Sequence, residues 1–154
     1  MGLKKTFGII GVVVSIALLT CMVSSATAAG TRIDLLNPPP ADGLYLAVGE
    51  SYTFDLEIAD GTPFILAMAM PDAYYPGRAI IWHGNDIAHQ AKSATLHLTM
   101  TGKNSTAGLP VVCDWPEPGV CWPEGVAPAS IVVGVRSEKG VVLSERFDFF
   151  VVVP

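Results

Sequence analysis

Histidines and methionines are the residues of this 154-residue chain whose types first suggest chemistry. Outside a cell, His and Met side chains would suit a copper ion. No two histidines have the close spacing of a ligand pair, and the methionines continue alternating apolar runs, which predicts that they belong to the core. We therefore expect no metal and no cofactor. The residues considered are His83, His89, His97, Asp86, Met68, Met70 and Met100.

Catalytic motifs are missing from the sequence. It contains no nucleophile elbow, no zinc-protease helix motif, no phosphate-binding glycine loop and no Cys-x-x-Cys. Asp55 and Glu57 could be a carboxylate pair, but they alternate with apolar residues and are expected on a solvated face rather than in the pocket that general acid–base catalysis needs. We expect no enzyme; an enzymatic role would need a tight pocket that collects His83, Asp86 or His89.

Composition excludes some partners and locates the protein. The chain is 51% hydrophobic with a net charge of −5, and this acidic balance argues against nucleic acid. Residues 1–28 have the basic start, apolar middle and small-residue end of a secretory signal, which predicts cleavage after Ala28, with Ala29 as the alternative. A retained apolar helix or a lipid anchor at Cys21 are the competing interpretations. Either way we expect a secreted or cell-envelope protein, contacting the membrane only if the helix is retained.

One loop contains Trp-Pro-Glu twice, between and beside two cysteines. Once the leader has removed Cys21, Cys113 and Cys121 remain, and in an exported chain such a pair is expected to form a disulfide. A stiff closed ring holds its aromatic side chains in place before binding. Trp115 and Trp122 are therefore candidate anchors for a protein or glycan, although they could equally cover one end or face of the fold. Further candidates for the same surface are Tyr74, Tyr75 and Trp82.

Short alternating segments indicate the elements that position these residues. Residues 51–58 alternate apolar and polar side chains throughout, and residues 94–100 repeat the pattern. Residues 131–136 and 146–153 also place apolar side chains at every second position, which is typical of half-buried strands. Shorter candidates are residues 32–36, 44–48, 64–70 and 79–83, separated by Gly- and Pro-rich turns. No run of ten residues has a helical period. The prediction is an all-β fold for residues 29–154: an antiparallel two-sheet β-sandwich of seven to eight strands, preceded by the hydrophobic signal helix.

The first and last long strands predicted within residues 29–154 resemble segments of a known group of domains. The segment Leu46–Phe54 resembles the Val-Gly-Glu-x-Tyr-x-Phe opening of exported microbial Ig-like domains, and Glu145–Val153 resembles their final strand. The resemblance implies an Ig-like β-sandwich and names no activity. Chagasin-type protease inhibitors share both features, but their two inhibitory loops are absent, so that function does not carry over.

The final strand and one loop complete the sequence-based expectations. From Phe149 onward the last strand is apolar on both faces, so it is either covered on both sides or an edge that awaits a partner. Asn104 begins a formal glycosylation sequon. We expect an exported, non-catalytic binding or adhesion module; the alternative is a structural subunit of a filament, pilus or sheath that polymerises through this strand or the N-terminal helix.

Overall fold

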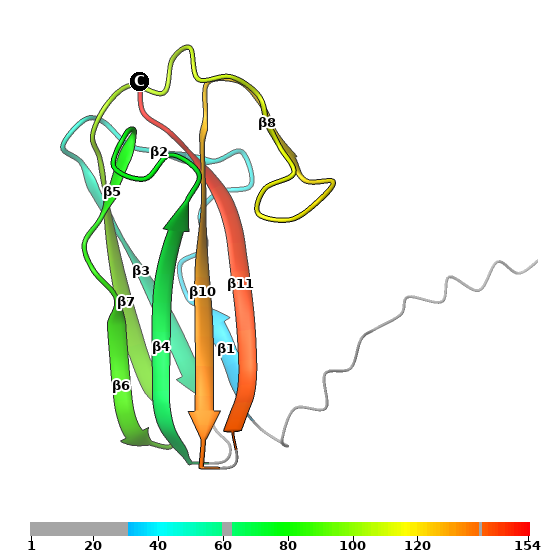
Figure 1. Cartoon of the computed structure of the whole chain (residues 1–154). Coiled ribbons are helices and arrows are strands. Elements are labelled where there is room, and N and C mark those ends of the chain that lie inside the picture. Colours follow the sequence, from blue (N-terminus) through cyan, green and yellow to red (C-terminus); the bar gives the residue numbers. More distant parts are fainter. Residues whose placement is uncertain (1–30, 60–62, 139) are drawn as a thin grey trace, which may run out of the picture.

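The computed structural model describes residues 31–59, 63–138 and 140–154, whose regular secondary structure consists of strands (Figure 1). The predicted leader, residues 1–28, lies outside the described residues. In the described part no helix is long and apolar enough to cross a membrane. The strands are β1 (Arg32–Leu35), β2 (Leu44–Tyr45), β3 (Ser51–Ala59), β4 (Phe64–Ala73), β5 (Ile80–Trp82), β6 (Asp86–Ala91), β7 (Ala94–Gly102), β8 (Val112–Cys113), β9 (Cys121–Trp122), β10 (Ala127–Ser137) and β11 (Gly140–Val152).

Two larger sheets and one small hairpin contain all these strands. The first sheet has the order β1-β3-β7-β5, the second has the order β2-β11-β10-β4-β6, and β8 pairs only with β9. Every pairing is antiparallel except that of β2 with β11, which is parallel. The expected all-β class is thus confirmed, but the second sheet is mixed rather than purely antiparallel.

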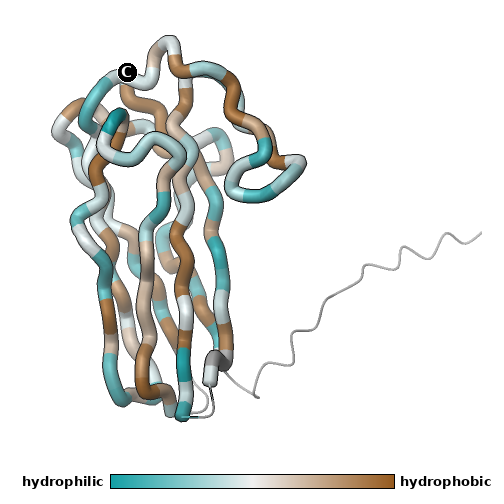
Figure 2. Tube along the Cα trace, viewed as in Figure 1, coloured by the Kyte–Doolittle hydropathy of each residue, from teal (hydrophilic) through white to brown (hydrophobic). Residues whose placement is uncertain are grey.

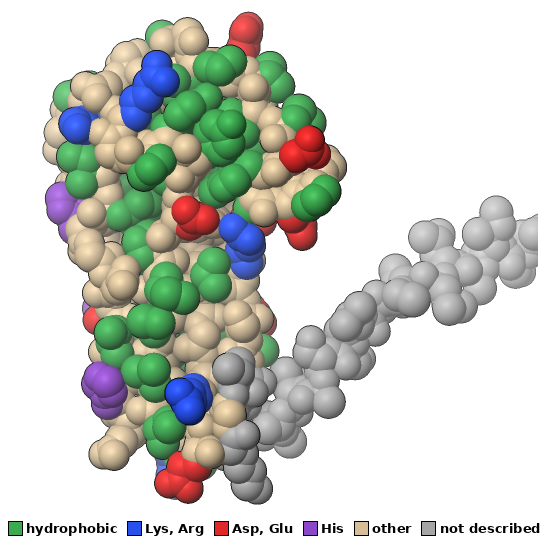
Figure 3. Space-filling model, viewed as in Figure 1, with side chains coloured by type: hydrophobic (Ala, Val, Ile, Leu, Met, Phe, Trp, Pro, Cys, Tyr) green, Lys and Arg blue, Asp and Glu red, His purple; other side chains and the backbone are tan. Residues whose placement is uncertain are grey.

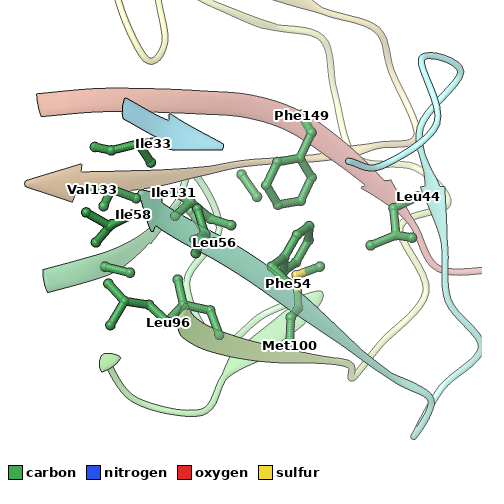
Figure 4. Packing of buried hydrophobic residues seen from close by; sticks show 14 of the residues in the cluster. Ile33, Leu44, Phe54, Leu56, Ile58, Leu96, Met100, Ile131, Val133 and Phe149 are labelled. Carbon is green, nitrogen blue, oxygen red and sulfur yellow. The ribbon is translucent and has the colours of Figure 1, made fainter. Parts of the chain in front are cut away.

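A single apolar core lies between the two sheets (Figure 4). Phe54, Leu56 and Ile58 of β3 face Ile131 and Val133 of β10, and all five side chains are fully buried. The alternation predicted along the strands is visible as alternating colours in Figure 2. This burial of one face per sheet supplies most of the favourable free energy of folding.

The methionine positions on β4 were predicted wrongly. Met68 is half-buried and Met70 is 38% exposed, whereas Ala67 and Ala69 are fully buried. The cause is pairing: Ala69 lies opposite Val133, whose side chain points into the core, so the side chains of Met68 and Met70 must point outward. Met100, in contrast, is fully buried as predicted.

The strand count also differs from the predicted seven to eight. The structure has additional short strands, and β6 occupies a segment around His89 for which no strand was predicted. Its pattern of alternately exposed and half-buried residues contains too few large apolar side chains to be recognised as a strand. Of the shorter candidates, residues 44–48 pair only at Leu44 and Tyr45.

Candidate binding surface

The Trp-Pro-Glu loop folds as a hairpin closed by a disulfide. Cys113 and Cys121 are joined and exposed, and they are also directly opposed in the β8–β9 pair, which confirms the predicted bridge. Inside the loop, the Trp122 Nε1–H donates a hydrogen bond to the Trp115 carbonyl oxygen at 2.7 Å. This bond fixes the two tryptophans relative to each other. In Figure 1 the hairpin extends beside the upper part of β11.

Trp115 contacts the predicted aromatic residue Tyr74, and Tyr74 in turn contacts Tyr75. The Trp115 ring centre lies 6.0 Å from that of Tyr74 in an edge-to-face arrangement, and Tyr74 lies 4.7 Å from Tyr75 in the same way. The guanidinium carbon of Arg146 lies 6.0 Å from the centre of the Trp115 ring, at the limit of a cation–π contact. We call Tyr74, Tyr75, Trp115 and Arg146 the aromatic surface.

Arg146 is held in place by three polar partners. Its Nε–H donates to Asp148 Oδ1 at 3.0 Å, its Nη2 donates to the Ser130 hydroxyl at 3.4 Å, and Nη2 lies 3.8 Å from Asp72 Oδ2. These partners lie directly opposite one another on three neighbouring strands: Asp72 on β4, Ser130 on β10 and Asp148 on β11. These contacts hold the Arg146 guanidinium beside the Trp115 ring, where a ligand can reach it.

Burial raises the pKa of the Asp148 carboxyl. The neighbouring Arg146 guanidinium lowers the pKa through its charge and hydrogen bond, and the charge of Glu117 on the hairpin loop raises it further. The carboxylate is therefore partly desolvated, and Glu117 of the hairpin loop is near enough for its charge to act on it. A ligand that adds a hydrogen-bond donor here would compensate part of that desolvation.

Apolar side chains continue the aromatic surface along the same sheet face. Met70 stands beside Val132, and Val132 stands beside Arg146. Met68 is paired with Ile87, which is 45% exposed. Figure 3 shows the resulting distribution: hydrophobic side chains gather over β4 and β10, with charged side chains between the upper and lower groups. We call Met68, Met70, Ile87 and Val132 the apolar patch.

Trp122 faces a different part of the molecule. Its ring lies 6.0 Å from that of Phe150, at the upper end of β11. Beside them runs a groove of about 400 Å³, lined by Trp122, residues 146–150 of β11, Leu35, residues 38–41 and Gly43. Trp115 and Trp122 therefore lie on two different surfaces, the aromatic surface and this groove.

Trp82 lies apart from both surfaces. Its ring packs 5.7 Å from Phe54 and 6.3 Å from Phe149, at the side of the core. Its buried Nε1 has no hydrogen-bond partner. The structure thus brings together four of the five predicted aromatic residues around the hairpin and leaves Trp82 half-buried against the side of the core.

The histidines serve local contacts on the strands. His97 Nδ1 lies 2.6 Å from Asp55 Oδ1 on the neighbouring strand, and His83 Nε2 lies 2.7 Å from the Thr101 hydroxyl. The Asp86 carboxylate accepts a hydrogen bond from the His97 backbone N–H. Among residues 31–59, 63–138 and 140–154, no three His, Cys, Asp or Glu side chains are grouped to hold a metal ion.

Residues of the predicted sequon form hydrogen bonds to other parts of the fold. The Asn104 side-chain amide donates to the Arg78 carbonyl oxygen. Thr106, the third sequon residue, is 1% exposed, and its hydroxyl is bonded to the backbone of Val153. Asn104 itself is exposed.

Sequence reasoning missed Arg146 and its carboxylate partners. The only signal is weak: Arg146 and Asp148 occupy outward positions of the last strand, two residues apart. Asp72 joins them only because β4, β10 and β11 are neighbours, which alternation within one strand cannot reveal.

Comparison with known proteins assigns no family. The chain matches no protein-family model, and no curated protein matches it either.

Proposed function

We propose that this chain is an exported, non-catalytic module with an Ig-like β-sandwich fold that binds a protein at or outside the cell envelope. Two features support export: the leader-like residues 1–28, and a disulfide of a kind that persists in oxidising compartments. The observation that carries the binding role is the contact of Trp115 with Tyr74 and Arg146, while Tyr74 stays 42% exposed.

The surroundings of the aromatic surface favour a protein partner over a glycan. Interfaces between proteins are enriched in Tyr, Trp, Met and Arg, and the centre of the interface is depleted of charged residues. The aromatic surface supplies Tyr, Trp and Arg, and the adjoining apolar patch supplies Met68 and Met70. A glycan would use the aromatic rings but would leave the apolar patch exposed to water.

The alternative role, a filament subunit that polymerises through the apolar final strand, receives less support. Phe150, on the outer face of that strand, is already in contact with Trp122, and its ring lies directly against Gly43. This outer apolar side is therefore covered within the chain at Phe150.

A binding assay on envelope fragments tests the proposal. The exported protein is labelled and titrated onto envelope fragments from cells of its own source that lack the gene. Tyr74→Ala should weaken binding at least tenfold, because exposed aromatic anchors carry much of an interface's affinity. Tyr45→Ala is the matched control, since Tyr45 is 60% exposed and lies outside the aromatic surface.

Pretreatment of the fragments identifies the class of partner. Protease treatment should abolish binding, and periodate oxidation of glycans should leave it unchanged. The reverse pattern would show a glycan partner. Equal binding by Tyr74→Ala and the unmodified protein would refute a role for the aromatic surface.

A further inference from the structure

One edge of the second sheet is open along most of β11. This strand is paired with β10 along its length, but on its other side it pairs with β2 only at Val151 and Val152. Residues 144–148 therefore have no strand beside them on that side in the described part of the chain. An extended stretch of five residues is about 16 Å long.

The pairing with β2 shows which backbone groups face the open side. The Val152 carbonyl oxygen accepts a hydrogen bond from the Leu46 N–H at 3.0 Å, so the backbone polar groups of Val152 point toward β2. Alternate residues of a strand direct these groups to the same side. The N–H and C=O groups of Ser144, Arg146 and Asp148 consequently point away from β10, into the open edge.

The chain's own neighbouring segment cannot complete the sheet. The connection from β1 to β2 runs along the groove beside β11, and it contains three consecutive prolines at positions 38–40. Proline has no backbone N–H to donate to a ladder. The groove thus has one wall of strand backbone and another of proline rings, with Trp122 among its lining residues.

The charged side chains along this edge are mainly acidic. Glu145 points to the inner face of the sheet, opposite Val133, and in the described structure it has no basic partner. Burial raises the pKa of its carboxyl, and the charge of Asp34 on β1 raises it further. Arg32 is paired with Asp34 at 2.6 Å, and Arg146 is occupied by Asp148 and Asp72. The acids here include Glu145, Asp148, Asp34 and, on the hairpin loop, Glu117.

We propose that the open edge of β11 binds an extended segment of a partner polypeptide that carries a basic side chain opposite Glu145. The segment forms main-chain hydrogen bonds with Ser144, Arg146 and Asp148 and so adds a strand to the sheet. A residue directly opposite Glu145 points to the same sheet face, where opposite charges attract at short range. A second copy of this chain fits less well, because it would bring the same acidic edge and a further net charge of −5.

This binding site is distinct from the aromatic surface and does not depend on the function proposed above. The added strand uses the backbone of β11 and the inner-face carboxylate of Glu145. The aromatic surface uses side chains on the outer face. Tyr74→Ala should therefore leave strand addition unchanged, so the two proposals can fail separately.

Synthetic heptapeptides are the probes for the test. The first has the sequence TVTKTVT with blocked ends, which places its lysine and valines on one face of a strand; the second has glutamate in place of the lysine. Each is titrated into the full exported protein, and amide hydrogen exchange is followed residue by residue by NMR. The lysine peptide should slow exchange at least tenfold at the amides of Ser144, Arg146 and Asp148, and should bind at least tenfold more tightly than the glutamate peptide.

Two variants separate edge binding from general effects. Ser144→Pro removes one outward N–H without breaking a bond to β10 and should weaken the lysine peptide at least tenfold, while Ser144→Ala should not. Glu145→Lys should reverse the preference between the two peptides, a result that a purely structural role of Glu145 would not produce. Melting curves of each variant confirm that it is folded.

Three results would overturn the proposal. The first is unchanged exchange at the three amides with the lysine peptide at millimolar concentration. The second is equal affinity for the two peptides. The third is protection of these amides in the protein alone together with a dimer in analytical ultracentrifugation, which would identify the occupant as a second copy of this chain.

Discussion

Gly43 shows how a single small residue determines the outer cover of the final strand. Its φ is +100°, a left-handed conformation that favours glycine. A Cβ placed there would overlap the Phe150 ring, with Cδ2 and Cζ only 2.7 and 2.9 Å away. The absence of a side chain therefore lets the β1–β2 connection pass directly against the ring.

Gly43→Ala should lower the free energy of unfolding by about 2–4 kcal/mol. The positive φ strains an alanine backbone, and the new Cβ overlaps the Phe150 ring, so two destabilising effects add up. Gly108→Ala is the matched control: its φ is +78°, but a Cβ there meets nothing within 4 Å. It should cost only about 1 kcal/mol of strain. Urea unfolding of both variants measures the difference, and equal losses would show that the Phe150 ring moves aside freely.

At the scale of elements, the disulfide hairpin is separate from the two larger sheets. β8 and β9 pair only with each other, and the hairpin is connected to the rest of the fold through Trp115 and Trp122. Two-residue strands cannot support an independent hairpin. The bridge and these ring contacts must therefore stabilise it.

Replacing Cys113 and Cys121 by serine should destabilise the hairpin while the two-sheet core stays folded. Closing a nine-residue ring restricts the unfolded chain by about 2–3 kcal/mol in the chain-entropy model. The expected result is faster amide exchange and proteolysis within residues 112–122 and weaker binding by the aromatic surface. Amides of β3 and β10 serve as the internal control. Loss of protection in those strands as well would mean that the hairpin and the core unfold together.

At the scale of the whole molecule, the long segment between β7 and β10 is attached to the end of the chain. Thr106 donates its backbone N–H to the Val153 carbonyl oxygen at 2.8 Å, and its hydroxyl oxygen accepts from the Val153 N–H at 3.1 Å. Both residues are buried. This attachment closes the end of the structure beside which the hairpin projects.

Thr106→Val should lower the free energy of unfolding by about 1–3 kcal/mol, since it leaves the buried Val153 N–H without an acceptor. Thr95→Val on the exposed side of β7 makes the same chemical change where no such bond is lost. Its effect should stay within about 0.5 kcal/mol. Thermal and urea unfolding provide the comparison, and a stability like that of Thr95→Val would show that water replaces the hydroxyl.

Local patterns predicted much of the fold. Alternation identified β3, β7, β10 and β11 and assigned their buried faces correctly, because a strand with one wet face must alternate. It failed for β4, whose two faces carry alanines and large apolar residues, so hydrophobicity alone selects the wrong face. Trp82 likewise has the residue type of an anchor, and only its packing against Phe54 and Phe149 places it at the side of the core.

The sequence by itself determined the all-β class, the Cys113–Cys121 pair and the aromatic content of the loop, since each depends on residue types at short separations. Only the tertiary structure decided that Asp72, Arg146 and Trp115 meet, because strand order brings together residues that are distant along the chain. It also decided that β11 keeps an open edge. The edge stays open because the proline-rich connection between β1 and β2 runs beside β11 without pairing along it. The alternation of residues within β11 cannot predict this path.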